Sequence, residues 1–326
     1  MTAHSPSDTL VTVYGGSGFL GRHVVRALAQ LDYRIRVAVR HPDLAFHLQP
    51  LGKVGQIHAV QANLRHAPSV QAAARDAQVL INLVGILYEG GRQRFDAIHS
   101  QGAEQVALAA NAHGARLVHV SAIGADEASH AKYARSKAAA EQLVLAAQPQ
   151  AVIMRPSILF GPEDNFFNRF ASLATMSPAL PLIGGGHTRF QPAFVGDVAS
   201  AIADAVDGKA RGGTIYELGG PEVRTFKELM QLMLATIERK RLLVPFPFWL
   251  AKLQAMALQF LPVPLLTPDQ VDMLRVDNVV AEAAKADGRT LQGLGITPEP
   301  MEAILPTYLW RFRKTGQFRN RTVRAL

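Results

Sequence analysis

The chain has 326 residues, which is enough for one large domain with a smaller appendage and a sizeable core. It contains no cysteine, which excludes disulfides, thiolate metal sites and a cysteine nucleophile. The net charge is +8, and residues 311–326 hold six Arg or Lys side chains and no acid. A basic tail of this kind favours an anionic partner, but it is also typical of a solvated segment.

The amino-terminal residues 1–9 are polar, and no apolar run reaches the roughly 18 residues that a membrane span needs. We therefore expect no secretory or transit peptide and no membrane span. The expected location is the cytoplasm, with peripheral attachment to the inner face of a membrane as an alternative. The histidines show no spacing typical of metal ligands, so no metal site is expected.

The first half of the sequence alternates apolar, strand-like segments with segments of helical periodicity. The expected strands are 10–14, 34–40, 57–62, 78–84, 116–121 and 151–155. The expected helices are 19–31, 68–76, 96–113 and 131–147. This alternation is typical of βαβ units, so the predicted fold class is α/β, with a doubly wound parallel sheet.

Beyond residue 156 the elements become shorter, and Pro and Gly become more frequent. We expect strands at 193–195 and 214–218 and helices at 197–206 and 225–238. The predicted organisation is a first domain, a small lobe interleaved with it and the basic tail, at residues 1–156, 157–310 and 311–326.

The stretch VTVYGGSGFLG places Gly15, Gly18 and Gly21 directly between a strand and a helix. One glycine permits a tight turn, a second lets the backbone approach a pyrophosphate, and the third lets helix and strand pack closely. The amino end of the helix then offers free N–H groups to the phosphates. In the first βα turn of a βαβ unit, this spacing predicts a Rossmann-type NAD(P) site in residues 1–156.

The residue at the end of the second strand discriminates between the two dinucleotides. An acidic residue there would bind the ribose 2′-OH of NAD, but this chain has Arg40 in VAVRHP. A guanidinium favours a 2′-phosphate, so NADP(H) is favoured over NAD(H). Arg22 is a candidate to assist Arg40 in binding the 2′-phosphate. Asp43 lies too far beyond the strand to serve as the acid that binds the ribose 2′-OH.

The stretch YARSK supplies Tyr133 and Lys137, which share one face of a helix because they are four residues apart. An ammonium near a phenol is expected to lower the pKa of the tyrosine. The phenol can then exchange a proton with a carbonyl or alcohol oxygen while hydride moves to or from the nicotinamide.

Together, the glycine motif, the Tyr133/Lys137 pair, RPSILFGP and PAFVGDVASAI resemble the extended short-chain dehydrogenase/reductase family over residues 10–310. VSAIGAD, YARSKAAAEQLV and RPSILFGPEDNFFNRF are most similar to its atypical branch. That branch contains the nucleotide-binding accessory subunit of respiratory complex I and its bacterial relatives.

The resemblance implies that Asn63 lies near the adenine, that residues 82–85 line the cofactor, and that Pro156 and Ser157 approach the nicotinamide. The expected catalytic residues are Tyr133, Lys137 and Ser121. The expected cofactor-binding residues are Gly15, Ser17, Gly18, Phe19, Leu20, Gly21, Arg40, Asn63, Leu64, Val84, Gly85, Ser121, Tyr133, Lys137 and Pro156.

The sequence departs from the family pattern at two catalytic positions. His99 stands where the family has an asparagine, and the slot for a catalytic Ser or Thr falls on either Ser121 or Ala122. Turnover is therefore less well supported than nucleotide binding. We interpret His99 as a structural histidine bonded to the backbone, with a proton relay as the alternative. Asp197 is expected to cap the next helix and not to act as a catalytic acid.

Residues 242–266 are apolar, and prolines bracket about fourteen residues of helix there, with Trp249, Leu253, Met256 and Phe260 on one face. The segment is too short and too interrupted to span a bilayer. Three alternatives stay open: a helix packed on the small lobe, a face toward a membrane or quinone, and a lid over a substrate.

These observations predict three alternative functions. The first is an NADPH-binding accessory protein similar to the complex I subunit, with a structural or redox-sensing nucleotide. The second is an active NADPH-dependent reductase or isomerase acting on a quinone, a quinone precursor, or a sterol-like or lipid molecule. The third is a membrane-peripheral assembly or lipid-handling protein with a residual nucleotide site. The expected partners are complex I or a quinone and an anionic membrane surface, and a nucleic-acid partner is not expected.

Overall fold

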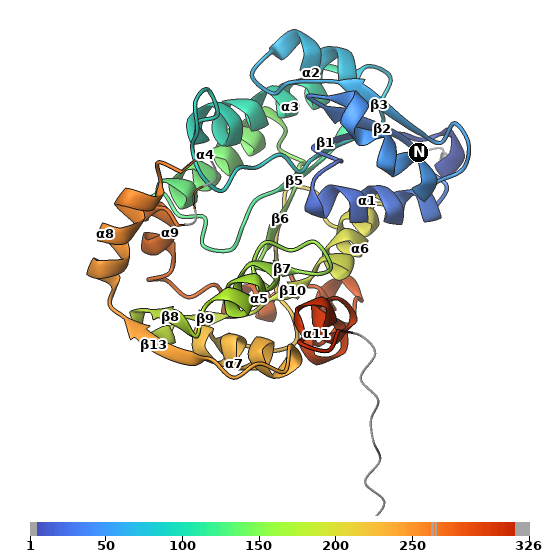
Figure 1. Cartoon of the computed structure of the whole chain (residues 1–326). Helices are drawn as coiled ribbons and strands as arrows, with labels where there is room; N and C mark the ends of the chain where they lie inside the picture. Colours follow the sequence, from blue (N-terminus) through green and yellow to red (C-terminus); the bar gives the residue numbers. More distant parts are fainter. Residues whose placement is uncertain (1–4, 262–263, 265, 317–326) are drawn as a thin grey trace, which may run out of the picture.

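A seven-stranded parallel sheet forms the centre of the molecule (Figure 1). The structure, a computed structural model, describes residues 5–261, 264 and 266–316. The strand order is β11-β6-β5-β4-β1-β2-β3, which is Rossmann-type. The strands are β1 (Leu10–Tyr14), β2 (Arg34–Val39), β3 (Ile57–Gln61), β4 (Val79–Asn82), β5 (Arg116–Val120), β6 (Val152–Pro156) and β11 (Ile215–Leu218).

Helices cover both faces of this sheet. The helices are α1 (Phe19–Gln30), α2 (Ala67–Ala74), α3 (Gln101–Ala112), α4 (Lys132–Ala147) and α6 (Val195–Val206). Side chains of α1 and α6 pack on one face of the sheet, and side chains of α2, α3 and α4 pack on the other. Because both faces are covered, the central strands are mostly Val, Ile and Leu, with buried polar exceptions such as Thr12 on β1 and His119 on β5.

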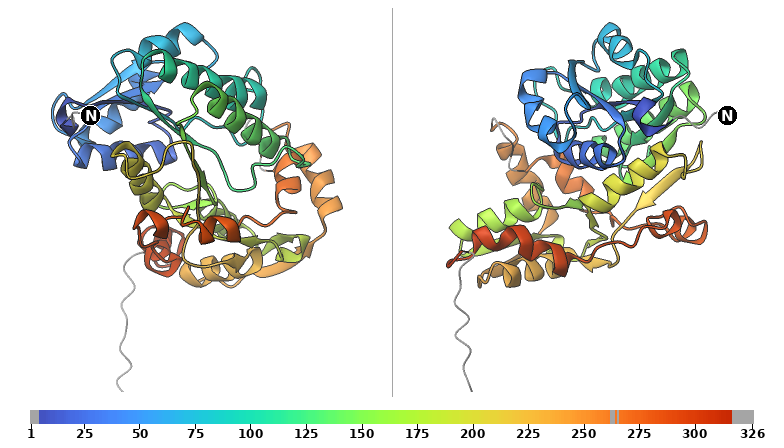
Figure 2. Two further views of the ribbon diagram at one scale, coloured as in Figure 1. Left: turned by 180° about the vertical axis from the view of Figure 1, so that it is seen from behind. Right: turned by 90° about the vertical axis from the view of Figure 1, so that its right-hand side faces the viewer.

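A second layer of shorter elements lies below the sheet in Figure 1, and Figure 2 shows the same division from two further sides. Its helices are α5 (Phe167–Met176), α7 (Phe226–Thr236), α8 (Phe248–Leu258), α9 (Pro268–Met273), α10 (Glu282–Ala286) and α11 (Met301–Leu309). Its strand pairs are β7 (Leu159–Phe160) with β10 (Ala193–Phe194), β9 (Arg189–Phe190) with β12 (Arg224–Thr225), and β8 (Ala179–Ile183) with β13 (Leu242–Phe246). Aromatic residues of α5, β9 and α7 fill its core.

The elements predicted from the sequence are found with small shifts at their ends. The strand predicted at 78–84 ends at Asn82, because the Asn82 side chain turns back and accepts a hydrogen bond from the Val84 N–H. The helix predicted at 96–113 begins as a π-helix, Asp96–Ser100, and continues as α3. Within the apolar segment 242–266, residues 242–246 form a strand, and α8 is shorter than predicted.

Strand β11 comes from the second part of the chain and pairs with β6 from the first part. The two parts therefore interleave, while the domain boundaries given above stay a prediction. A buried ion pair fixes α4 beneath this pairing: the Arg155 guanidinium on β6 donates to the Glu141 carboxylate on α4 at 2.5 and 2.8 Å. Glu217 on β11 lies 3.4 Å from the other side of the same guanidinium, so one arginine joins three elements.

Candidate functional site

The glycine turn lies at the carboxyl end of β1, between β2 and β4 in the middle of the sheet. Gly15 has a φ of 79°, and its N–H donates to the Ala38 carbonyl at 3.0 Å. A Cβ added at Gly21 would lie 2.4 Å from the Gly15 carbonyl oxygen, so α1 and β1 approach too closely for any side chain there. The turn has the conformation and the close helix packing that the pyrophosphate motif requires.

The first N–H groups of α1 point toward this turn. Gly18 is the N-cap residue, and no side chain caps the helix, so the N–H groups of Phe19, Leu20 and Gly21 have no side-chain acceptor. Ser17 lies in the turn itself. An uncapped helix end above a glycine turn that a Cβ would fill fits the phosphates of a dinucleotide.

Arg40 is exposed directly after β2. Asp43 is also exposed and belongs to the 3-10 segment Pro42–Leu51. Arg22 points elsewhere, because its Nη1 lies 3.4 Å from the Glu163 carboxylate. Of the two basic residues considered for a 2′-phosphate, only Arg40 is without an ion pair in the part of the chain that the structure describes.

The loops after β3 and β4 form the next part of the carboxyl edge. Asn63 is half-buried, and its Oδ1 accepts a hydrogen bond from the Arg65 N–H at 3.1 Å. The Leu64 side chain packs into the core against Gly102, so only its backbone can face a ligand. Val84 covers the glycine turn, since its Cγ2 would lie 3.0 Å from a Cβ at Gly15.

The Tyr133 ring and the Lys137 ammonium lie together on α4, with Nζ 5.9 Å from the ring centroid. Lys137 is buried, and its Nζ donates to the Val120 carbonyl at 3.1 Å. Burial lowers the pKa of Lys137 to about 8, and the Glu141 carboxylate opposes the shift. A Cβ built at Gly85 would lie 3.6 Å from this Nζ, so the loop after β4 passes directly beside it.

The expected lowering of the tyrosine pKa is wrong for this structure. Burial and the charge of the Asp269 carboxylate raise the pKa of Tyr133 to about 12. Asp269, at the start of α9, accepts hydrogen bonds from the backbone N–H groups of Lys132 at 2.5 Å and of Tyr133 at 3.1 Å. A carboxylate from far along the sequence thus caps α4 and opposes ionisation of the phenol.

Ser121 and Ala122 follow β5 on the same edge. Ser121 is buried, and its Oγ has no hydrogen-bond partner among the described residues, whereas Ala122 is half-buried. His119, two residues before Ser121 on β5, lies near the Lys137 ammonium, and no motif in the sequence predicts this. Its Nδ1 lies 3.2 Å from Asn82 Nδ2, its buried Nε2 lacks a partner in the described part, and burial lowers its pKa to about 3. The signal in the sequence was a lone polar residue inside an apolar strand.

His99 is buried in the π-helix and is bonded on both ring nitrogens. Its Nε2 accepts from the Ile86 N–H at 3.0 Å, so Nδ1 carries the hydrogen and donates to Ser136 Oγ at 2.8 Å. Its ring also packs edge-on against Tyr133, with centroids 5.3 Å apart. Burial lowers the pKa of His99 to about 2, so the ring is neutral at physiological pH. The predicted bond between His99 and the backbone is confirmed.

Pro156 is buried at the end of β6, and the next residue, Ser157, donates to the Asn278 side chain at 2.6 Å. The expectation that Asp197 caps a helix is wrong, because α6 already begins at Val195 and has no side-chain cap. Asp197 instead accepts a hydrogen bond from the Glu299 N–H at 2.8 Å. Its role is structural, as it joins α6 to the segment before α11.

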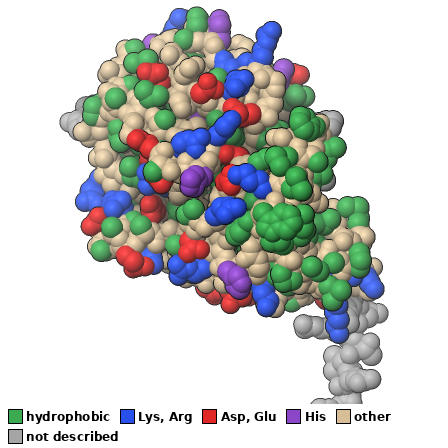
Figure 3. Space-filling view, turned by 90° about the vertical axis from the view of Figure 1, so that its left-hand side faces the viewer, with side chains coloured by type: hydrophobic (Ala, Val, Ile, Leu, Met, Phe, Trp, Pro, Cys, Tyr) green, Lys and Arg blue, Asp and Glu red, His purple; other side chains and the backbone are tan. Residues whose placement is uncertain are grey.

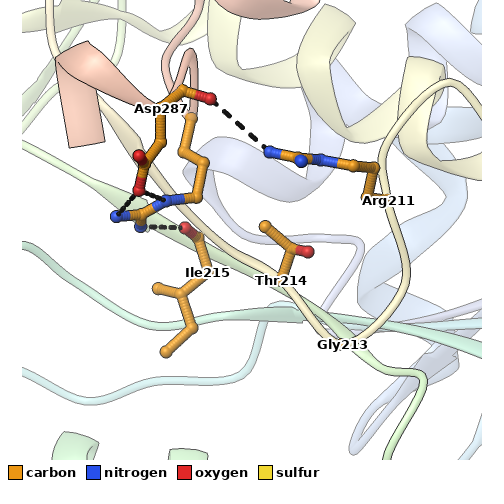
Figure 4. A pocket seen from close by; sticks show the side chains of 6 residues that line it. Arg211, Gly213, Thr214, Ile215 and Asp287 are labelled. Atoms are coloured by element: carbon orange, nitrogen blue, oxygen red, sulfur yellow. Dashed lines mark hydrogen bonds and ion pairs between the residues drawn. The ribbon is translucent and has the colours of Figure 1, made fainter. Parts of the chain in front are cut away.

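A cavity of about 480 Å³ lies away from this edge, beside the amino end of β11 (Figure 4). Its polar groups bond to one another: Arg289 donates to Asp287 and to the Ile215 carbonyl, and Arg211 reaches the Asp287 carbonyl. Parallel strands present their carboxyl ends at the opposite edge, so this cavity is separate from the glycine turn.

The helix α8 carries an exposed apolar surface. Trp249, Leu253 and Met256 are exposed, as are Phe260 and Leu261 just beyond the helix. Hydrophobic side chains gather on the side of the molecule that holds α8, with Lys and Arg side chains beside them (Figure 3). None of the described helices is both long and apolar enough to cross a membrane. Residues 317–326 of the predicted basic tail lie outside the described residues.

Comparison with known proteins gives matches over most of the chain. The family model described as "NAD dependent epimerase/dehydratase family" matches residues 11–219. The mitochondrial "NADH dehydrogenase (ubiquinone) 1 alpha subcomplex subunit 9" of Arabidopsis thaliana is 38% identical over 326 aligned residues, covering 96% of this chain and 80% of that protein. The "Ceramide reductase" of Caulobacter vibrioides is 37% identical over 174 residues, covering 53% of this chain and 54% of that protein.

Solved structures show the same fold at low sequence identity. The UDP-glucose 4-epimerase of Thermus thermophilus, solved in complex with NAD, superimposes with a TM-score of 0.69 at 20% identity. The superposition covers 94% of this chain and 99% of that one. The Rossmann-type fold predicted from the sequence is confirmed.

The buried ammonium of Lys137 predicts a rise in stability with pH. Its folded-state pKa of about 8 lies below the ordinary 10.5, so between these values the unfolded chain binds the extra proton and unfolding becomes less favourable as pH rises. We expect the free energy of unfolding to gain about 1.5 kcal/mol between pH 8 and about pH 9.5, a range below the titration of Tyr133.

Urea unfolding at the two pH values measures this gain. The Lys137→Met variant should lose it, because the buried titrating group is gone. The Lys285→Met variant is the matched control, since Lys285 is exposed on α10 and should keep the gain. An equal rise in wild type and Lys137→Met would contradict the burial argument.

Proposed function

The chain belongs to the NAD dependent epimerase/dehydratase family, and from that membership we propose that it is an NADP(H)-binding accessory protein of respiratory complex I. In this proposal the nucleotide is structural or senses redox state. The glycine turn, the uncapped end of α1 and the Val84 loop would hold the dinucleotide, which supplies hydride chemistry when bound. The subunit 9 relative, similar over nearly the whole chain, supports the assignment to complex I.

The observation that carries this proposal is the state of the polar groups beside the glycine turn. Tyr133 is held in its protonated form by burial and by Asp269. His99 uses both ring nitrogens for internal hydrogen bonds and cannot pass a proton onward without breaking one. The site therefore retains the parts that bind a nucleotide, while His99, at the position where the family has an asparagine, is committed to internal hydrogen bonds.

The exposed surface of α8 supports a role at an interface. Trp249 is 68% exposed and Phe260 is 84% exposed, which is unusual for such large apolar side chains. In an accessory protein this surface would lie against the assembly or an anionic membrane, with the neighbouring basic side chains toward lipid headgroups. Peripheral attachment to a membrane is thus part of the proposal, and so is a contribution from the basic tail.

A second candidate function is favoured by one specific observation. Tyr133 and Lys137 keep the spacing of a proton-donating pair, and the Ser121 hydroxyl lies buried without a partner among the described residues. In an active reductase on a hydrophobic carbonyl compound, Ser121 and Tyr133 would both donate to the substrate oxygen. The similarity to a ceramide reductase over about half of the chain supports a lipid substrate, and quinones are the alternative.

Nucleotide occupancy tests the accessory function. The full chain is purified without added nucleotide, the ligand is released by denaturation and identified by mass, and the bound cofactor is followed by absorbance after quinone is added. We expect one NADPH per chain that stays reduced. A Gly21→Val variant is the control without nucleotide, because its side chain would fill the turn. An empty site, or rapid oxidation by quinone, would contradict the proposal.

The preference for NADP(H) depends on Arg40. Replacing it in Arg40→Ala should weaken NADPH binding by about tenfold or more, the effect of losing a charge-assisted hydrogen bond. NADH binding should change little, because NADH has no 2′-phosphate. Arg34→Ala is the matched control, since Arg34 is exposed at the other end of β2. Equal losses for both nucleotides would contradict the assignment.

The reductase candidate depends on the Tyr133 hydroxyl. If NADPH is consumed with a keto-ceramide or a short-chain quinone, Tyr133→Phe should lower the turnover rate by about a hundredfold or more, since general acid catalysis contributes that much. Tyr33→Phe serves as the control, because Tyr33 bonds to Asp207 on the other side of the sheet. An unchanged rate in Tyr133→Phe would exclude the phenol as the proton donor.

A further inference from the structure

A cavity of about 520 Å³ lies outside the glycine turn, between the loop after β3, the turn at residues 90–93 and one side of α3. Arg65, Arg92 and Arg94 line it, together with Gln101 and Gln105. We propose that this arginine-lined cavity is a second anion site, which binds the phosphate group of a small phosphorylated ligand. It goes beyond the proposed function, which assigns only the dinucleotide.

The charge of the cavity is uncompensated by the protein. In the part of the chain that the structure describes, none of the three guanidiniums of Arg65, Arg92 and Arg94 forms an ion pair with a carboxylate. Some exposed arginines elsewhere are paired, as Arg189 is with Asp277, whereas the exposed Arg40 has no ion pair among the described residues. Three like charges around one cavity repel one another, and an anion in the cavity would relieve that repulsion.

The carboxylates nearest to Arg92 and Arg94 in the sequence do not neutralise the cavity. Glu89 turns to the backbone, where its Oε1 accepts a hydrogen bond from the Phe95 N–H at 2.9 Å. Asp96 is exposed at the start of the π-helix and does not line the cavity. The lining thus contains three arginines, two neutral amides and the apolar or small residues Leu64, Ala67, Gly91 and Ala97, without an acid.

The cavity wall is held in shape by the backbone. Gly90 and Gln93 exchange two backbone hydrogen bonds of 3.0 Å, and Gly91 has a φ of 56°, so residues 90–93 form a tight closed turn. Arg65 Nη1 donates to the Arg92 carbonyl at 3.2 Å, which ties the loop after β3 to this turn. The arginines are therefore carried by two linked loops and not by one mobile segment.

The donor set suits a phosphate. A guanidinium presents parallel N–H groups that match two phosphate oxygens, and several guanidiniums can share one dianion. Gln101 and Gln105 are four residues apart on α3, so their amides lie on the same side of the helix and add neutral donors. A phosphate monoester, with its two negative charges, fits three arginines and two amides better than a singly charged carboxylate.

Calorimetric titration with inorganic pyrophosphate tests this site in the full chain at low ionic strength. The titration is run both without nucleotide and with saturating NADPH, which occupies the glycine turn if the proposed function holds. We expect binding in both conditions. The Arg92→Gln/Arg94→Gln variant should bind pyrophosphate at least about tenfold more weakly, because charge-assisted contacts are lost. Arg34→Gln, which removes an exposed arginine far from the cavity, should leave the affinity unchanged.

Two results would overturn the proposal: equal affinity of wild type and Arg92→Gln/Arg94→Gln, or loss of pyrophosphate binding when NADPH saturates the chain. A chain that takes up no NADPH but shows arginine-dependent pyrophosphate binding would contradict the proposed function and support this site. Vesicles containing phosphatidic acid separate the sources of the phosphate. Vesicle binding that needs Arg92 and Arg94 and that pyrophosphate displaces assigns a lipid headgroup, and its absence assigns a free ligand.

Discussion

The close approach of α1 to β1 determines where every other part of the nucleotide edge lies. At Gly21 the helix backbone comes so near the Gly15 carbonyl that no side chain fits between them. This contact places the uncapped end of α1 over the middle strand of the sheet, where β2 and β4 flank it. The loops carrying Arg40 and Val84 lie at the same edge, because the carboxyl ends of all strands in a parallel sheet lie at one edge.

The first half of the fold could be predicted because each of its elements carries its own signal. Runs of Val, Ile and Leu mark strands that are covered on both faces, and the glycine turn marks the end of β1. The small lobe gives weaker signals, because its order depends on contacts between distant segments. The strand β13, for example, contains Pro245 and pairs with β8 some sixty residues earlier, so nothing in its own apolar sequence predicts a strand.

The candidate site also has one part that could be predicted from the sequence and one part that could not. Motif residues such as Gly15, Tyr133 and Lys137 could be found from spacing alone, since each motif lies within one short segment. The pKa shifts at the site could not be predicted from the sequence, because they depend on residues that are distant in the sequence and close in the fold. Nothing in the sequence near Tyr133 shows that Asp269 caps its helix, or that the buried ring of His119 lies near the Lys137 ammonium.

The hydrogen bonds from α4 to Asp269 also connect the two layers of the molecule mechanically. Because α9 belongs to the small lobe, a movement of that lobe away from α4 would withdraw a negative charge from the phenol and expose two backbone donors. The acidity of Tyr133 would then increase as the lobe opens. A contact made on the α9 side would therefore alter the electrostatic surroundings of the phenol even though it lies outside the nucleotide edge.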